Sequence, residues 1–503
     1  MAPARRDTIH VRWPLGLLLL ANRAGSGLGE EEGGDDEGCG MKKSNPSYEA
    51  FINSKRHTSG QYGFSPVWIP DCAFDFQEFI IRKAVKKGRI GIFADTGLGK
   101  TLIQIAIAEN IVRKTNKNVL ILTPLAVAFQ FLDEAEKIGV EDITHSKTGK
   151  IKSKITVCNY ERLHLLDSSD FECVMLDESS ILKNYQGKMR DDIIAFIKRV
   201  PYRFLSTATP SPNDFIELGN SSEALGYMGY MDMLTKFFKS NQNSVDSNNR
   251  NIGEKFYLKP HAERDFFAWI NQWSVMVKTP SDLGFSNDRY ILPELKVNHH
   301  KVMNERQWSI NGQNSLFAMP AKTMTEVREE QKLTVDKRCE KAAELARGKT
   351  SVYWCNLNEE SSLLADIDKE AVEIIGGMSI NKKEEILVAF SHGEIKRLIT
   401  KAKMTSMGLN WQHCNHTVFF PTWSYEQYYQ AIRRFWRFGQ KNDVTCDMVI
   451  SEGQERVLEA LEQKTQKAIE LYQNLVAATN QDFTDKRRSE NTPLILPQFL
   501  NAN

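Results

Sequence analysis

The chain has 503 residues, which is too long for one ordinary hydrophobic core, so two or three domains are expected. Its Pro, Gly and Cys contents are ordinary for a globular protein, and none of the eight cysteines forms a CxxC pair, so neither a zinc knuckle nor a disulfide framework is suggested. The formal net charge is only +1, so composition alone does not favour a nucleic-acid partner, although basic residues can still gather locally.

The first forty residues differ from the rest. Three arginines (5, 6 and 12) precede an apolar run, Trp13–Ala21, which loosely imitates a signal peptide but is too short to span a membrane. A stretch rich in Gly and acidic residues follows, up to Gly40, and then comes Met41. We interpret residues 1–40 as a disordered extension, or as sequence upstream of a start at Met41, in preference to a targeting signal.

Buried parallel strands are indicated by apolar, β-branched runs in the first half of the chain. The predicted strands are Arg89–Phe93, Asn118–Leu122, Val174–Leu176 and Arg203–Ser206. A heavily apolar helix, Lys100–Val112, lies between the first two. Alternation of strand and helix predicts a doubly wound α/β layer.

The pattern lapses between about Asp214 and Pro320, where we expect helical segments and polar loops, and then resumes. The second half is predicted to contain helices at Val335–Ala346 and Lys382–Phe390, strands at Ser351–Cys355, Arg397–Thr400, Thr417–Phe420 and Val444–Ile450, and a last helix near Glu452–Ala478 that packs back across one lobe. The expected organisation is therefore an extension (1–40), a first lobe (41–215), a partly helical insertion and connector (216–325), a second lobe (326–478) and a tail (479–503).

A phosphate-binding loop is predicted directly after the first strand. The segment reads Ala94, Asp95, Thr96, Gly97, Leu98, Gly99, Lys100, Thr101, which is the P-loop pattern with Ala in place of its first Gly. Glycines let backbone N–H groups turn toward phosphates, and the following helix adds its positive N-terminal end. Lys100 can reach the β and γ phosphates, and the Thr101 hydroxyl can bind Mg²⁺.

Hydrolysis also needs an acid at the end of a neighbouring strand. The run Val174–Leu176 ends in Asp177 and Glu178. We expect Asp177 to help hold Mg²⁺, and Glu178 to orient or deprotonate the attacking water. An acidic pair alone is common at the end of a strand, so this prediction depends on the P-loop upstream.

With these motifs in place the chain resembles superfamily 2 helicases, and further motifs follow in that family's order. The resemblance implies an adenine-reading glutamine, Gln77, segments that contact nucleic acid or couple it to ATP, and a motif VI that supplies arginines to ATP. The implied coupling or nucleic-acid residues are Thr123, Pro124, Thr207, Thr209, Gly408, Asn410 and Gln430, with a further track segment at Asn159–Glu161. The resemblance spans nearly all of 70–475 and implies two RecA-like lobes, ATP and Mg²⁺ as cofactors, and nucleic acid as partner.

Motif VI carries the most specific part of the resemblance. Its spacing, Gln430, Arg434, Arg437 and then Gly439–Gln440, is similar to that of the Swi/Snf-type branch. The segment Leu182–Asn184, which follows the motif II residues 177–180, is also similar to that branch. We expect Arg434 and Arg437 to share one helix face and to reach across a cleft to the γ-phosphate. Arg433 departs from that branch, where many members carry Asp. The compact build resembles bacterial or bacteriophage members, so we expect a cytoplasmic protein, or a nuclear one in a eukaryote.

Two other classes remain as alternatives. A nuclease would use Pro280–Asp282 and Glu294–Lys296 as a PD…ExK metal site, but so short a pattern arises easily by chance. We expect His299–His300 to form a polar turn, since no carboxylate or Cys lies at ligand spacing. A nucleic-acid clamp without ATPase activity, or a restriction or defence subunit, is the second alternative. The intact Lys100, Glu178 and motif VI arginines argue against a silent clamp. We expect an ATP-dependent DNA helicase or duplex-DNA translocase, and strand separation and translocation without unwinding both remain open. Swi/Snf-type relatives usually translocate on duplex DNA, which favours translocation and favours DNA over RNA.

Overall fold

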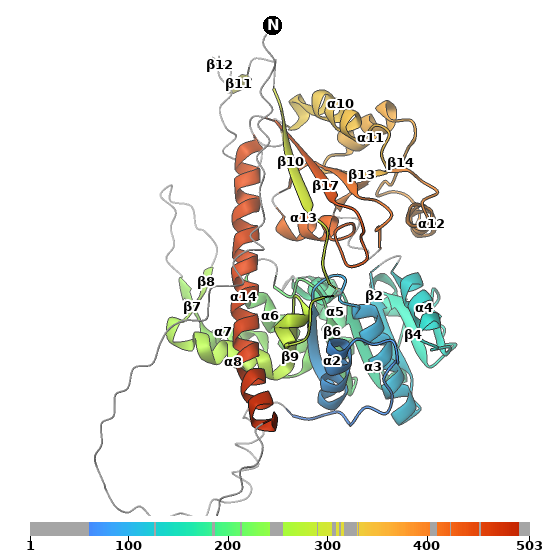
Figure 1. The fold of residues 1–503 in the computed structure, drawn as a ribbon, viewed down its shortest axis with the longest axis vertical. Coiled ribbons are helices and arrows are strands. Elements are labelled where there is room, and N and C mark those ends of the chain that lie inside the picture. Colours follow the sequence, from blue (N-terminus) through green and yellow to red (C-terminus); the bar gives the residue numbers. More distant parts are fainter. Residues whose placement is uncertain are drawn as a thin grey trace, which may run out of the picture. The chain divides into compact units, whose positions relative to one another are not determined.

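The computed structural model describes residues 60–124, 127–183, 187–211, 214–241, 255–288, 290–303, 308–310, 313–315, 329, 331–402, 410–422, 424–451 and 454–491. The interpretations of residues 1–40 and of the tail after 491 therefore lie outside the described residues. Within the described part, two parallel sheets, each flanked by helices, make up two α/β lobes (Figure 1). This confirms the predicted fold class.

The first lobe is built on a seven-stranded sheet with the order β3-β4-β2-β5-β6-β1-β9. Every neighbouring pair is parallel. The strands are β1 (Arg89–Ala94), β2 (Val119–Thr123), β3 (Ile143–His145), β4 (Ile155–Asn159), β5 (Cys173–Asp177), β6 (Tyr202–Ser206) and β9 (Ser274–Val277). The four strands predicted in this half are all present.

Two hydrophobic cores cover the two faces of this sheet. Successive side chains of a strand point to opposite faces, so Val119 and Ile121 of β2 join one core while Leu120 and Leu122 join the other. Burial on both faces explains why the strand is apolar throughout. The first core is completed by α2 (Asp75–Lys87), α3 (Lys100–Thr115) and α4 (Ala128–Lys137); the second by α5 (Lys188–Ile197), α6 (Leu218–Leu225), α7 (Tyr230–Phe237) and α8 (Glu263–Trp273).

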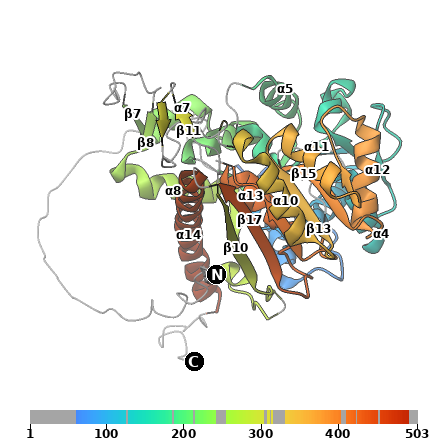
Figure 2. The same cartoon turned by 90° about the horizontal axis from the view of Figure 1, so that it is seen from above.

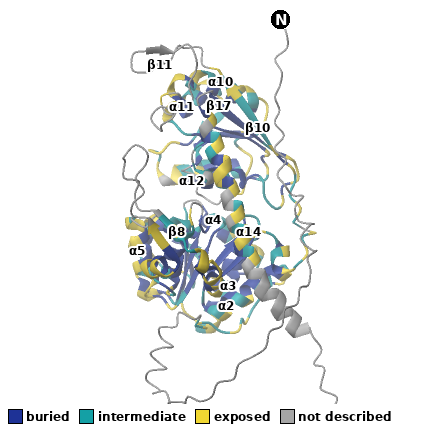
Figure 3. Ribbon diagram, turned by 90° about the vertical axis from the view of Figure 1, so that its left-hand side faces the viewer, coloured by how far each residue is buried: buried dark blue, intermediate teal, exposed yellow. Residues whose placement is uncertain are grey.

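The second lobe is built on a six-stranded parallel sheet with the order β10-β17-β16-β13-β15-β14. Its strands are β10 (Leu295–Val302), β13 (Ser351–Cys355), β14 (Ala371–Glu373), β15 (Arg397–Lys401), β16 (His416–Phe419) and β17 (Val444–Ser451). Its helices are α10 (Val335–Ala346), α11 (Asn358–Ile367), α12 (Ile380–Ser391) and α13 (Tyr425–Ile432). Figure 3 shows that the central strands of both sheets are buried, whereas the edge strands β10 and β14 are mostly of intermediate exposure.

The segment between the predicted lobes contributes to both sheets. Strand β9 pairs with β1 in the first sheet, and β10 pairs with β17 in the second. Sequence analysis expected only helices and polar loops here. The prediction missed β9 because it has only four residues, and it missed β10 because an edge strand tolerates the polar residues of Leu295–Val302. Two short hairpins, β7–β8 (Phe238–Asn241 with Lys255–Leu258) and β11–β12 (Trp308–Ile310 with Gln313–Ser315), also belong to this region.

The last described element is a long helix, α14 (Glu455–Asn491), which follows β17 directly. It contacts α13 of the second lobe, and it packs on α8, β9 and the short turn η6 (Pro280–Leu283) of the first (Figures 1 and 2). Its Tyr472 hydroxyl donates to the carbonyl of Phe93, at 3.2 Å. The predicted C-terminal helix is therefore present, but two details of the prediction are wrong: the helix continues past Ala478 to Asn491, and it contacts both lobes where one was expected.

Candidate active site

The predicted P-loop joins the end of β1 to the start of α3. Gly97 and Gly99 have φ values of 88° and 76°, a left-handed conformation that side chains rarely adopt. A Cβ atom at Gly99 would lie 2.2 Å from the Gln77 side-chain nitrogen, and one at Gly97 would lie 3.0 Å from the Phe438 backbone nitrogen. Both glycines are thus required by backbone conformation and by close neighbours, one of which comes from the second lobe.

Lys100 lies, partly buried, at the first position of α3. Its ammonium group donates to the carbonyl oxygens of Ala94, at 3.0 Å, and Asp95, at 3.3 Å. Burial lowers the pKa of Lys100, while the nearby carboxylates of Glu178, Asp95 and Asp177 oppose that shift. The Lys100 ammonium group is therefore held at the P-loop by neutral carbonyl oxygens and by nearby acids. An anion with several negative charges, such as a phosphate chain, would bind this cation more strongly than the carbonyl oxygens do. Thr101 follows it, partly buried, at the N-terminal end of the same helix.

Gln77 connects the P-loop to the start of α2. Its side chain accepts from the backbone N–H of Phe74 and donates to the carbonyl of Leu98, each at 3.0 Å. Four aromatic rings form a cluster at this end of α2: Tyr290 contacts Phe74 and Phe76 edge-on and stacks on Phe438 of the second lobe, with the Tyr290 and Phe438 ring centroids 4.7 Å apart. Sequence analysis missed Tyr290, which lies in the connector with no recognisable motif around it.

Asp177 and Glu178 stand at the end of β5, two strands from β1 in the sheet. The Asp177 carboxylate accepts from the Gln104 side chain of α3 at 2.8 Å, and its backbone carbonyl accepts from the Tyr160 hydroxyl at 2.6 Å. Burial, and then the neighbouring Glu178 charge, raise the pKa of Asp177. Sequence analysis predicted neither of these two hydrogen bonds. They form only because α3 and η1 (Tyr160–Leu165) pack beside β5, which the local sequence does not reveal.

Glu178 has an unusual backbone conformation for a residue other than glycine, with φ at 50°. Its carboxylate accepts from the Thr207 hydroxyl at 3.1 Å, and the same hydroxyl accepts from the backbone N–H of Thr209 at 3.1 Å. The two predicted coupling threonines thus connect the end of β6 to the acid at the end of β5. Strained backbone of this kind is concentrated at functional sites.

The second lobe contributes the segment that follows α13. The expectation that Arg434 and Arg437 share a helix face is wrong: α13 ends at Ile432, and residues 433–439 form successive turns. Both arginines are nevertheless brought to the first lobe. Burial lowers the pKa of Arg434 to about 9 and that of Arg437 to about 10, and in each case the Glu178 carboxylate opposes the shift. Arg434 also lies over the Trp411 ring, at 5.7 Å.

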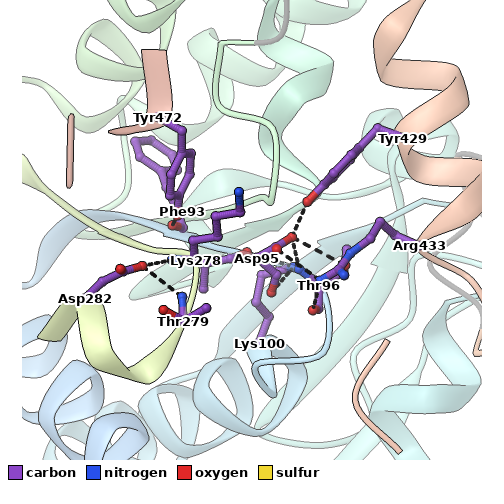
Figure 4. A network of polar contacts seen from close by, with 11 residues as sticks. Phe93, Asp95, Thr96, Lys100, Lys278, Thr279, Asp282, Tyr429, Arg433 and Tyr472 are labelled. Atoms are coloured by element: carbon purple, nitrogen blue, oxygen red, sulfur yellow. Dashed lines mark hydrogen bonds and ion pairs between the residues drawn. The ribbon is translucent and has the colours of Figure 1, made fainter. Parts of the chain in front are cut away.

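Arg433 makes the most direct contacts with the P-loop (Figure 4). Its guanidinium pairs with the Asp95 carboxylate at 3.0 Å, donates to the Thr96 carbonyl at 2.8 Å and also contacts the Thr96 hydroxyl. The hydroxyl of Tyr429, one helical turn earlier, donates to the same carboxylate. The sequence marked Arg433 only as a departure from its family's pattern, and did not single out Tyr429.

The remaining predicted residues are arranged as follows. Thr123 donates to the carbonyl of Pro124, which also accepts from Asn159, so these segments of β2 and β4 are in contact. Gln430 donates to Glu426 on α13. Asn410 is exposed, and Gly408 and Asn184 lie outside the described residues.

The alternative nuclease site is not assembled. Asp282 accepts from the backbone N–H groups of Lys278 and Thr279, and so caps a short turn, while Lys296 pairs with Asp443 at 2.7 Å. Within the described ranges, no group of three or more His, Cys, Asp or Glu side chains could hold a metal ion. The expected polar turn at His299–His300 is wrong, because both residues lie in β10.

His300 in fact has a carboxylate partner across the sheet, Asp447, at 3.0 Å. The other oxygen of that carboxylate bonds to His416, which in turn bonds to Ser351. Because partners in a sheet are distant in sequence, residue spacing could not reveal this network.

Two parallel sheets, one followed by a P-loop and paired acids and the other by arginines that face them, have the arrangement expected of a two-lobed ATPase. Family comparison agrees: residues 74–217 match the DEAD/DEAH box helicase family, and residues 335–439 match the helicase conserved C-terminal domain. These two regions are therefore the DEAD/DEAH-box and C-terminal domains found in superfamily 2 helicases, and together they imply a nucleic-acid-dependent ATPase activity.

Comparison with solved structures found the Sulfolobus solfataricus SWI2/SNF2 ATPase core in complex with dsDNA, at 18% identity and a TM-score of 0.37, covering 84% of this chain and 98% of that one. It also found an S. cerevisiae Dbp5 variant bound to RNA and ADP BeF3, at 13% identity and a TM-score of 0.49, covering 87% and 98%. Comparison with curated proteins gave no match. Among the described helices, none is both long and apolar enough to cross a bilayer.

Proposed function

We propose that this ATPase is a duplex-DNA translocase of the Swi/Snf-type branch, working in the cytoplasm of a bacterial or phage-infected cell. The observation that carries the proposal is the contact between the motif VI segment and the P-loop: Arg433 pairs with Asp95 at 3.0 Å, and a Cβ atom at Gly97 would lie 3.7 Å from the Cβ of Arg437. ATP bound there would contact both lobes at once, so each hydrolysis event would change how the lobes grip the polymer. The preference for this branch rests on the spacing of Gln430, Arg434 and Arg437.

Within this proposal the first lobe binds ATP. The backbone of 95–99 and Lys100 hold the phosphates, and Gln77 reads the adenine beside the Tyr290 ring. Thr101 and Asp177 would hold Mg²⁺, to which their oxygen atoms are suited as ligands, and the ion would neutralise charge on the phosphates. The pKa of Asp177 is raised by burial and then by the neighbouring Glu178, so a bound cation would stabilise the charged form of its carboxyl group.

Glu178 is then the residue that orients or deprotonates water, and Thr207 holds its carboxylate in place. Arg434 and Arg437 stabilise the charge that develops on the transferred phosphate. Thr209 couples the ATP site to lobe movement through Thr207. The nucleic-acid track comprises Thr123, Pro124, Asn159, Gly408, Asn410 and Gln430.

The test compares ATP hydrolysis without polymer and with single-stranded DNA, duplex DNA or RNA. Duplex DNA should stimulate most, and the protein should displace a third strand from a triplex without separating a forked duplex. Binding should weaken steeply with salt, because phosphate neutralisation releases counterions. Lys100→Ala serves as the control without turnover.

Three outcomes would contradict the proposal. Stimulation by RNA alone would assign the protein to RNA. Efficient separation of the fork would make it an unwinding helicase. Affinity that stays flat between low and moderate salt would mean that the polymer backbone is not the surface it grips.

A further inference from the structure

One face of α13 contacts the first lobe at two points. Glu426 and Tyr429 lie three residues apart on α13, on one side of the helix, and Arg433 follows as its C-terminal cap. Glu426 pairs with Lys183 of η3 (Ser179–Lys183), just after motif II, and Tyr429 and Arg433 contact Asp95 of the P-loop. The two ion pairs have opposite polarity, so the helix can dock favourably in only one direction.

The contact with Asp95 is buried, and both oxygens of the Asp95 carboxylate accept hydrogen bonds. Asp95 and Arg433 are each 6% exposed. The carboxylate accepts from its neighbour's backbone N–H (Thr96, 2.6 Å), from the Tyr429 hydroxyl and from Arg433. A buried ion pair is costly to break by removing one partner, because the other charge is left without compensation.

The main chain of the loop is held as well. The backbone N–H of Asp95 donates to the carbonyl of Val277 in β9, at 2.9 Å, which is a contact within the first lobe. The carbonyl of Thr96 accepts from Arg433, which belongs to the second lobe. Phe438 adds a steric limit, because its backbone nitrogen leaves no free space at Gly97. The first half of the loop is therefore shaped partly by its own sheet and partly by the turns after α13.

We infer that Tyr429 and Arg433 are positioning residues, which set the shape of the Asp95–Thr96 segment from the second lobe and so complete the P-loop only when α13 is docked. They act on protein atoms, in contrast to the role proposed for Arg434 and Arg437, which is to act on phosphate. The inference rests on the proposed assignment of 94–101 as the phosphate-binding loop. It adds that ATP affinity, and not only turnover, depends on lobe docking.

A double-mutant cycle on Asp95→Asn and Arg433→Gln tests this inference, with ATP turnover measured at saturating polymer. Each single variant should raise the KM for ATP at least about tenfold, since one member of a buried pair is removed. If Arg433 acts through Asp95, the double variant should be no worse than the more impaired single variant. Losses that multiply would overturn the inference, because Arg433 would then act independently of the loop carboxylate.

Tyr429→Phe is a milder variant in case the charge variants fold poorly. It removes only a hydroxyl, so we expect the KM for ATP to rise about threefold with kcat nearly unchanged. Arg433→Lys should recover part of the loss, as the charge remains but the planar fork is missing. A wild-type KM in Tyr429→Phe would contradict a positioning role for that hydroxyl.

Lys183→Met and Glu426→Gln are matched controls, because they remove the other contact of α13 without touching the P-loop. They should raise the polymer concentration needed for half-maximal turnover, yet leave the KM for ATP at saturating polymer near wild type. An equal rise in KM would mean that docking alone matters, and would overturn the inference. Lys100→Ala separates the two levels of failure: if it binds and hydrolyses ATP normally, the loop assignment itself is wrong.

Discussion

At the scale of single residues, Glu178 combines a strained backbone with a fixed carboxylate. A left-handed conformation costs a residue with a side chain about 1–2 kcal/mol, and Glu178 adopts it at the end of β5. The Glu178 carboxylate accepts a hydrogen bond from Thr207. Its negative charge also interacts electrostatically with Lys100, Arg434 and Arg437. The strain is therefore associated with orientation of the side chain toward the site.

Glu178→Gln should keep ATP binding and lose turnover, because the amide has nearly the same shape as the carboxylate but cannot accept a proton. General-base catalysis typically contributes about 10²–10⁴ in rate, which sets the size of the expected loss. ATP affinity and steady-state turnover are the two measurements. Glu172→Gln, just before the opposite end of the same strand, should match wild type in both. Normal turnover in Glu178→Gln would mean that another group activates water.

Arg437 should determine how strongly the polymer stimulates turnover. Arginine fingers contribute about 10³–10⁵ in rate, so Arg437→Ala should abolish stimulation while ATP affinity falls much less. Lys at this position should rescue poorly, because an ammonium group cannot reproduce the planar guanidinium fork. The measurement is polymer-stimulated turnover beside ATP affinity, for Arg434→Ala as well. Full stimulation in both variants would show that neither arginine reaches the transferred phosphate.

At the scale of elements, two tyrosines bond to opposite ends of β1 from different parts of the chain. Tyr227 donates to the carbonyl of Arg89 at 2.8 Å, at the start of the strand, and Tyr472 of α14 donates to the carbonyl of Phe93, next to the P-loop. Burial raises the pKa of both hydroxyls, so each stays protonated and able to donate.

The pair permits a matched prediction about α14. Tyr472→Phe and Tyr227→Phe should each lower the free energy of unfolding by about 1 kcal/mol, the usual contribution of one hydrogen bond. Only Tyr472→Phe should also change the KM for ATP, because only its bond lies beside the nucleotide loop. Urea unfolding and ATP kinetics measure the two effects. Equal kinetics in the two variants would limit α14 to a structural role.

At the scale of the whole molecule, the elements that could be predicted from sequence are those that are buried. Strands covered on both faces, such as β2 and β5, are apolar up to their last residue and were predicted to within a residue or two. The edge strand β10 could not be, because one side of it has no strand neighbour and its side chains are largely polar. The P-loop and Glu178 could be assigned because each lies within a few residues of the strand that positions it.

Contacts between lobes were harder to predict, for a different reason. The acidic partner of Arg433 lies 338 positions earlier in the chain, so nothing in the local sequence could indicate it. The turns at 433–439 were mistaken for helix because their spacing of arginines also suits a helix. Tyr429 could have been noticed from its spacing with Glu426 and Arg433 along α13, but its partner could not.

The pairing of β1 with β9 has a consequence for the order in which the chain can fold. Strand β1 is made early, yet one of its two neighbours is residues 274–277, and the Asp95 N–H depends on Val277 for its acceptor. A growing chain that has reached residue 217 holds every residue matched to the DEAD/DEAH box family but still exposes one edge of its nucleotide-binding strand. An exposed edge is a site for wrong pairing. The ribosome must therefore add some sixty further residues, those of α6 to β9, before the ATP site is protected.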